Sequence, residues 1–85
     1  MVARGRVQGI YYRASLQREA QQRALSGWVR NQSDGSVEAV LQGPEEDVNA
    51  VLAWARVGPR RAVVESLDVS WSAPDPTLLS FEIRG

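Results

Sequence analysis

The residues best suited to chemistry lie early in the chain, between Gly5 and Arg13. Two glycines, Gly5 and Gly9, allow the backbone to curl so that successive N–H groups point inward. A helical pattern begins directly afterwards, and a helix N-terminus adds unpaired N–H groups and a partial positive charge. Arg13 falls in the first helical turn, where its planar guanidinium suits an oxyanion. These features together predict a cradle for a phosphate-like group.

The same stretch has a simpler interpretation, in which a strand-to-helix turn needs two glycines and Arg13 is merely solvated. Short glycine motifs discriminate weakly between the two. A cation in the first helical turn opposes the helix dipole, so Arg13 is mildly unfavourable unless an anion lies between it and the N–H groups. This favours the cradle without excluding the plain turn.

A second candidate residue, Asn31, ends a predicted strand just before the turn formed by Gln32 to Gly35. Asparagine is a frequent turn residue, but its amide could instead orient a water molecule. The residues alone do not place Asn31 beside Arg13, so both interpretations stay open at this point.

Composition excludes several kinds of chemistry. The chain has 85 residues with no cysteine and no histidine, and all ten of its basic residues are arginine. A thiol nucleophile, a cysteine-ligated metal and a histidine base are therefore impossible. A Schiff base or a P-loop lysine is excluded as well. An acidic run, Glu45 to Asp47, resembles a metal cluster but is better explained as favourable charge at a helix start.

Charge and hydropathy narrow the expected partners. Ten arginines balance ten acidic residues, whereas a non-specific nucleic-acid binder normally has a basic excess. No apolar run is long enough to span a membrane, and no signal peptide is expected before the first motif. We therefore expect a cytoplasmic monomer that binds neither nucleic acid nor membrane.

Hydrophobic periodicity predicts an α+β fold in one domain over residues 1–85. Helical spacing begins at Tyr12, continues through Leu16 and Ala20 to Ala24, and resumes after Pro44, which suits a first helical position. Extended patterns, with an Asp-Gly hairpin signal between the second and third, cover residues 2–7, 25–31, 36–42, 62–71 and 78–83. The order β-α-β-β-α-β, with a further strand at the end, predicts a ferredoxin-like sandwich with an antiparallel sheet and both helices on one face.

Three segments, in this order, resemble the acylphosphatase family. They are the loop Gly5-Arg6-Val7-Gln8-Gly9-Ile10-Tyr11-Tyr12-Arg13, the segment Gly27-Trp28-Val29-Arg30-Asn31 with Asp34-Gly35, and Gly58-Pro59 before a stretch that ends at Trp71. The first two together are highly specific, although neither glycine turn alone would be. The resemblance implies the ferredoxin-like fold and hydrolysis of acyl phosphates to carboxylate and phosphate, without a metal or an organic cofactor.

The resemblance also implies roles for individual residues. Arg13 matches the family's phosphate-binding arginine, and Asn31 matches its water-orienting asparagine. The backbone N–H groups of the preceding loop would hold the phosphoryl oxygens, which assigns substrate binding to Arg6, Val7, Gln8, Gly9, Ile10 and Tyr11. Two other classes are considered. One is a non-catalytic anion-binding module of the same fold. The other is an RNA-binding module, which would need aromatic and basic residues together on a strand, and we expect no such motif here.

Two departures from the family bear on stability. Only four residues precede Gly5, so the first strand is short, and Ala24 stands where the family usually has glycine. If Ala24 has a positive φ, alanine costs on the order of 1 kcal/mol relative to glycine. We further expect Arg60 and Arg61 to be solvated and the three tryptophans, Trp28, Trp54 and Trp71, to be buried or half-buried.

Overall fold

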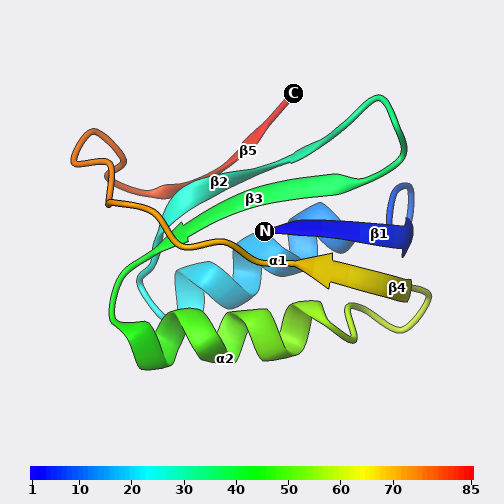
Figure 1. The fold of residues 1–85 in the computed structure, drawn as a ribbon, viewed down its shortest axis with the longest axis horizontal. Helices are drawn as coiled ribbons and strands as arrows, with labels where there is room; N and C mark the ends of the chain where they lie inside the picture. Colours follow the sequence, from blue (N-terminus) through cyan, green and yellow to red (C-terminus); the bar gives the residue numbers. More distant parts are fainter.

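The chain folds into one twisted sheet with two helices packed against the same face (Figure 1). The computed structural model describes residues 1–85. The sheet has the strand order β4-β1-β3-β2-β5. In chain order the elements are β1 (Val2–Arg6), α1 (Tyr12–Gln22), β2 (Ser26–Asn31), β3 (Val37–Gln42), α2 (Glu45–Ala55), β4 (Val63–Asp68) and β5 (Phe81–Arg84). This confirms the predicted ferredoxin-like α+β fold.

The last strand departs from a purely antiparallel sheet. Strands β1 to β4 form antiparallel pairs, whereas β5 pairs in parallel with β2, from Gly27 opposite Phe81 to Arg30 opposite Arg84. The β5 strand also begins later than predicted, at Phe81, and β4 ends earlier, at Asp68. Pairing with neighbouring strands decides these ends, and the local apolar pattern does not contain that information.

The core lies between the sheet and the helices. Alternate residues of the central strands, such as Ala3, Val29 and Val37, are fully covered. Leu16 and Ala20 of α1 and Val51 of α2 cover them from the other side. The predicted helix face therefore packs as expected, except for Ala24, which lies beyond the end of α1 and is exposed.

A β-bulge shapes the pairing of β1 with β4. Arg4 lies opposite Ser66 and Gly5 lies opposite Val64, so β4 has one extra residue, Glu65, between them. Gly5 has φ 124°, and a Cβ there would collide with the carbonyl oxygen of Val63. Glycine is therefore required at the point where β1 turns toward its loop.

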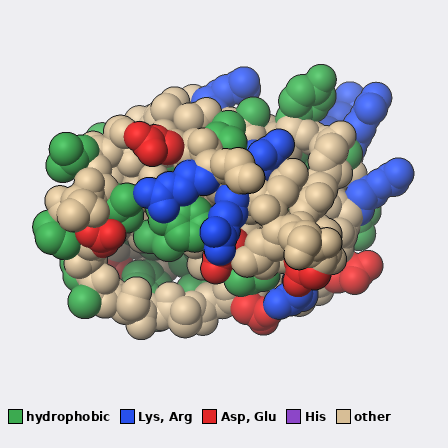
Figure 2. All heavy atoms as spheres, turned by 90° about the horizontal axis from the view of Figure 1, so that it is seen from above, with side chains coloured by type: hydrophobic (Ala, Val, Ile, Leu, Met, Phe, Trp, Pro, Cys, Tyr) green, Lys and Arg blue, Asp and Glu red, His purple; other side chains and the backbone are tan.

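The short β1 leaves part of β3 without a partner on that side. The two strands pair at Val2 and Ala3, and the main chain of Met1 also bonds to that of Ala39, but β3 continues to Gln42. Beyond this point lies a hollow of about 1020 Å³, lined in part by the loop that includes the 63% exposed Trp71 (Figure 2). The expectation that all three tryptophans are at least half-buried is wrong for Trp71, because no element packs over its loop.

We predict that Ala24→Gly stabilises the protein. Ala24 has φ 53°, a conformation that favours glycine, so the change should add about 1 kcal/mol to the free energy of unfolding. For a domain of this size, that corresponds to a rise in Tm of about 4–8 °C. Urea unfolding followed by circular dichroism measures the change in the free energy of unfolding.

The matched control is Ala53→Gly, at an exposed position inside α2. There the same substitution should lower stability by about 1 kcal/mol, since glycine weakens a helix interior. A urea midpoint for Ala24→Gly at or below that of the parent protein would contradict the prediction.

Candidate active site

The loop between β1 and α1 presents a run of free backbone N–H groups. Gly9 has φ 74° and Tyr11 has φ 66°, so alternate residues curl the chain into a shallow ring. No amide from Gln8 to Ala14 donates a hydrogen bond within the chain, and the amide of Ser15 is the first to do so, to the carbonyl of Tyr11 at 2.9 Å. This concentration of unpaired donors is suited to an anion.

Buried side chains hold this loop at both ends. Val7 and Tyr12 are each 1% exposed, whereas Tyr11 between them is 82% exposed. Burial raises the pKa of the Tyr12 hydroxyl, which stays protonated and donates a 2.8 Å hydrogen bond to the carbonyl of Ala55 in α2. The loop therefore keeps its shape through its anchors and leaves its own donors free.

Positive charge gathers at the same place without compensation from acidic residues. Helix α1 has no capping side chain and no acidic residue in its first turn, which contains Arg13. Neither Arg13 nor Arg6, at the end of β1, forms an ion pair, although Arg4, Arg23 and Arg30 do. The free guanidinium groups and the helix N-terminus therefore reinforce each other toward an anion.

Asn31 projects toward the helix-covered side of the sheet. Ala3 of β1 pairs with Val37 of β3, and Val37 pairs with Asn31 of β2, so the three side chains share one face. Ala3 and Val37 are fully buried, and the side-chain oxygen Oδ1 of Asn31 is also buried but has no hydrogen-bond partner. An unpaired buried amide oxygen costs about 1–3 kcal/mol, which is unusual enough to require a reason.

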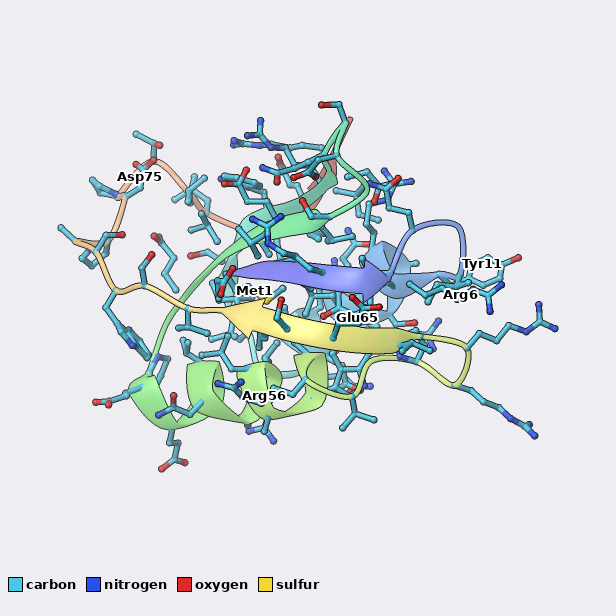
Figure 3. The ribbon with its side chains drawn as sticks, turned by 45° about the vertical axis from the view of Figure 1, so that its right-hand side comes forward. Met1, Arg6, Tyr11, Arg56, Glu65 and Asp75 are labelled. Atoms are coloured by element: carbon cyan, nitrogen blue, oxygen red, sulfur yellow. The ribbon has the colours of Figure 1, made fainter.

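The sheet topology brings Asn31 to the loop. Strands β1 and β2 both run antiparallel to β3, so Arg6 and Asn31 end at the same edge of the sheet. The side-chain amide of Gln8 then donates to the carbonyls of Gln32 at 2.7 Å and Ser36 at 2.9 Å. Figure 3 shows Arg6 and Tyr11 projecting together at this edge. The loop and the residue after Asn31 are thus joined directly, while no hydrogen bond links Arg13 to Asn31.

The hairpin turn after Asn31 is stabilised internally. The hydroxyl and amide of Ser36 donate to Asp34 Oδ1, and the Ser36 hydroxyl also contacts Oε1 of Gln32 at 2.6 Å. The hydroxyl and then the amide of Ser36, followed by Arg4, hold the pKa of the Asp34 carboxyl below its usual value. A rigid turn gives Gln8 two fixed acceptors, so the position of the loop is defined by the hairpin.

Comparison with known protein families identifies the family of the chain. The acylphosphatase family model matches residues 1–83. The chain belongs to the acylphosphatase family. An acylphosphatase of Azoarcus sp. (strain BH72) is 59% identical over 71 residues, which are 84% of this chain and 72% of that protein. An acylphosphatase of Natronomonas pharaonis is 48% identical over 80 residues, which are 94% of this chain and 86% of the relative.

The structural comparison agrees. The crystal structure of acylphosphatase from Bacillus subtilis superposes with a TM-score of 0.94 at 33% sequence identity, covering 99% of this chain and 93% of that one. The chain is therefore an enzyme that hydrolyses acyl phosphates, as its sequence predicts. The sequence resemblance and its implied fold are confirmed together.

The large hollow beside β3 contains none of the residues predicted for the site of this acylphosphatase. Its lining includes Trp28, Leu41 and Trp71 but none of the loop residues from Arg6 to Tyr11, nor Arg13 or Asn31. A phosphoryl group is small, and hydrogen-bond donors on a curled backbone can hold it without a deep cavity. The volume of a hollow is accordingly a poor guide to the site in this acylphosphatase.

Sequence analysis missed the contacts that hold the acylphosphatase loop in place. Gln8 is predicted as a substrate-binding residue, but its side chain is used to tie the loop to the main chain of Gln32 and Ser36. Main-chain carbonyl acceptors leave no signature in a sequence, so no signal could have revealed this pairing. The link from Tyr12 to the carbonyl of Ala55 was hidden for the same reason.

One sequence observation about the open face of the sheet is wrong. Sequence analysis finds no aromatic and basic residues together on a strand, yet Trp28 lies against Arg30 at 5.1 Å and Arg84 at 5.2 Å. Arg84 comes from β5, far away in sequence, so only strand pairing assembles this group. Arg30 is neutralised by Glu38 at 2.7 Å, and both arginines already stack on the indole.

We predict that Gln8→Ala weakens both the fold and phosphate binding. Removing two hydrogen bonds should lower stability by about 1–2 kcal/mol. The untethered loop should bind inorganic phosphate at least about fivefold more weakly, because its amides lose their fixed arrangement. Thermal unfolding and isothermal titration with phosphate measure the two effects.

Gln17→Ala is the matched control, because Gln17 also donates from its side-chain amide to a backbone carbonyl, that of Phe81 at 3.3 Å, away from the loop. It should lose stability but retain phosphate affinity. If Gln8→Ala also retains full phosphate affinity, the tether does not position the binding loop.

Proposed function

We propose that this acylphosphatase holds the phosphoryl group of its substrate in the loop from Arg6 to Tyr11, with Arg13 as the charged partner and Asn31 as the residue that orients water. The observation that carries the proposal is the buried Oδ1 of Asn31, which no protein group bonds, at the strand end to which the loop with free amides is tied. No protein group donates a hydrogen bond to that oxygen, so a water molecule can donate one.

The loop and Arg13 supply what phosphoryl transfer requires. The reaction spreads negative charge over the equatorial phosphoryl oxygens, and positioning and charge stabilisation account for most of its catalysis. Backbone N–H groups that are fixed before the substrate binds need no reorganisation during the reaction. The guanidinium of Arg13 adds a positive charge beside the N-terminus of α1.

Asn31 would position the attacking water. Its Oδ1 would accept a hydrogen bond from the water, directing a lone pair toward phosphorus on the side opposite the acyl oxygen. As the bond from water to phosphorus forms, the bond from phosphorus to the acyl oxygen breaks and the carboxylate leaves with its electron pair. A carboxylate needs no general acid to leave, and a phosphoryl oxygen can take the proton of the water. No histidine, cysteine, lysine or metal is needed for these steps.

A non-catalytic anion-binding module of the same fold is the alternative. It would use the same amides and Arg13 but would have no use for an oriented water. The Asn31 oxygen supports the enzyme, because no protein group bonds it and it is left as an acceptor for such a water.

We also propose that residues 1–85 act as one domain, as a monomer, in the cytoplasm, on small acyl phosphates and without nucleic acid. A single buried cluster from Ala3 to Phe81 supports the single domain. Balanced charge, with ten arginines and ten acidic residues, argues against a nucleic-acid partner. No helix in the structure combines the length and apolar character needed to cross a membrane.

We predict that Arg13→Ala loses phosphate affinity and activity together. The value of kcat/KM for benzoyl phosphate should fall by at least about 100-fold, since one well-placed donor to a transition-state oxyanion is commonly worth that much. Inorganic phosphate should bind correspondingly more weakly by titration calorimetry. The control is Arg18→Ala, at an exposed position on the same helix, which should change neither kcat/KM nor phosphate affinity. Normal turnover by Arg13→Ala would exclude this assignment.

We predict that Asn31→Ala loses turnover while it keeps phosphate affinity and stability. Removing the water-orienting amide should lower kcat for benzoyl phosphate by roughly 100-fold or more, while KM and phosphate binding change little. Because the lost oxygen has no partner in the protein, Tm should not fall by the amount typical of a lost buried hydrogen bond. An equal loss of phosphate binding would make Asn31 a structural residue instead.

A further inference from the structure

The segment between α2 and β4 lies at the same end of the sheet as the proposed site. At one end, the carbonyl of Ala55 accepts the hydrogen bond from Tyr12, the first residue of α1. At the other end, Val63 pairs with Arg6, the last residue of β1. The phosphate-binding loop connects the same two residues, Arg6 and Tyr12. The segment therefore starts and ends next to the two residues that bound the loop, and Gly58 within it lies against the Tyr12 ring.

This segment holds two arginines on a fixed turn. The amide of Ala62 donates to the carbonyl of Pro59 at 2.9 Å, which closes a turn with Arg60 and Arg61 at its tip. Both arginines are exposed, as predicted from the sequence. The turn is also held from below, because Gly58 approaches the Tyr12 ring so closely that a Cβ would lie 2.9 Å from a ring carbon.

No acidic residue neutralises these arginines. Arg60, Arg61 and the neighbouring Arg6 form no ion pair. Glu65, labelled in Figure 3, is the acidic residue near Gly5 on β4, and it too forms no ion pair. The acidic first turn of α2 lies at the opposite end of that helix (Figure 1). Arg6, Arg60 and Arg61 thus form a positive rim, in which no arginine has an ion-pair partner, in a chain that has no net charge.

We propose that Arg60 and Arg61 make the enzyme prefer acyl phosphates whose acyl group carries a negative charge of its own. The inference rests on the proposed function, in which the loop holds the phosphoryl group and leaves the acyl group at the mouth. An acyl carboxylate there would meet two cations on a rigid turn. Exposed apolar side chains beside the mouth, Tyr11 and Val63, can cover its carbon atoms.

The physical basis of the preference is Coulombic attraction at a partly exposed surface. Individual exposed charge pairs are weak, but two cations on a turn with no acidic neighbour act together on one anion. The attraction extends over a Debye length of about 10 Å at 0.1 M salt and about 3 Å at 1 M. The preference should consequently be largest in dilute buffer and should shrink as salt is added.

The test compares two substrates that differ by one charge, benzoyl phosphate and 4-carboxybenzoyl phosphate. The measured quantity is the ratio of their kcat/KM values, the substrate with the additional carboxylate over benzoyl phosphate. In the double variant R60Q/R61Q the ratio should fall roughly threefold to tenfold in low salt, with kcat/KM for benzoyl phosphate little changed. In 1 M NaCl the parent protein and the variant should converge.

The matched control is R18Q/R56Q, which removes the same net charge from exposed positions outside the rim. Arg18 lies within α1, and Arg56 points away from Arg6 and Tyr11 in Figure 3. This variant should keep the parent ratio. An unchanged ratio in R60Q/R61Q, or an equal fall in both double variants, would overturn the inference and leave the proposed function intact. Failure of the folded parent protein to hydrolyse benzoyl phosphate would overturn the proposed function and the inference with it.

Discussion

The structure depends on one constraint: a loop must stay curled while its backbone donors remain free. Ordinary loops satisfy their amides with turns or side chains. Here the amides from Gln8 to Ala14 have no partner in the chain, so they contribute nothing to holding the loop. Its shape is imposed from outside, by the buried side chains of Val7 and Tyr12 at its ends and by the Gln8 amide on the hairpin.

This constraint explains where the molecule carries strain. Tyr11 has a positive φ although it is neither glycine nor asparagine, and it lies in the loop itself. The Asn31 oxygen is buried without a partner at the adjacent strand end. Both features oppose folding, and both occur where an anion or a water molecule would meet the protein. Favourable packing of α1 and α2 on the sheet offsets this cost, and it involves neither the Tyr11 backbone nor the Asn31 oxygen.

Paired and unpaired charges also lie in different parts of the molecule. Acidic residues occupy the first turn of α2, where they complement its dipole and where Asp47 pairs with Arg23 at 3.0 Å. At the other end of that helix and around the loop, Arg6, Arg13, Arg60 and Arg61 form no ion pair. The zero net charge of the chain therefore describes its composition and hides a polarity that only the fold creates. The net charge of a chain bears on its binding to large charged partners such as nucleic acids. Which charged side chains are paired decides what a particular site attracts.

The sequence by itself determined the fold class and the family, and it predicted the residues of the site. Hydrophobic periods and the glycine and proline breaks predicted the helix from Tyr12 and the hairpin around Asp34, because these signals are local. The spacing from Gly5 to Arg13 indicated an anion cradle for the same reason. Only the tertiary structure decided that Asn31 lies at the loop, that β5 is parallel to β2, and that the segment with Arg60 and Arg61 starts beside Tyr12 and ends beside Arg6. These facts depend on strand order and on main-chain carbonyl acceptors, neither of which is encoded in the identity of any single residue.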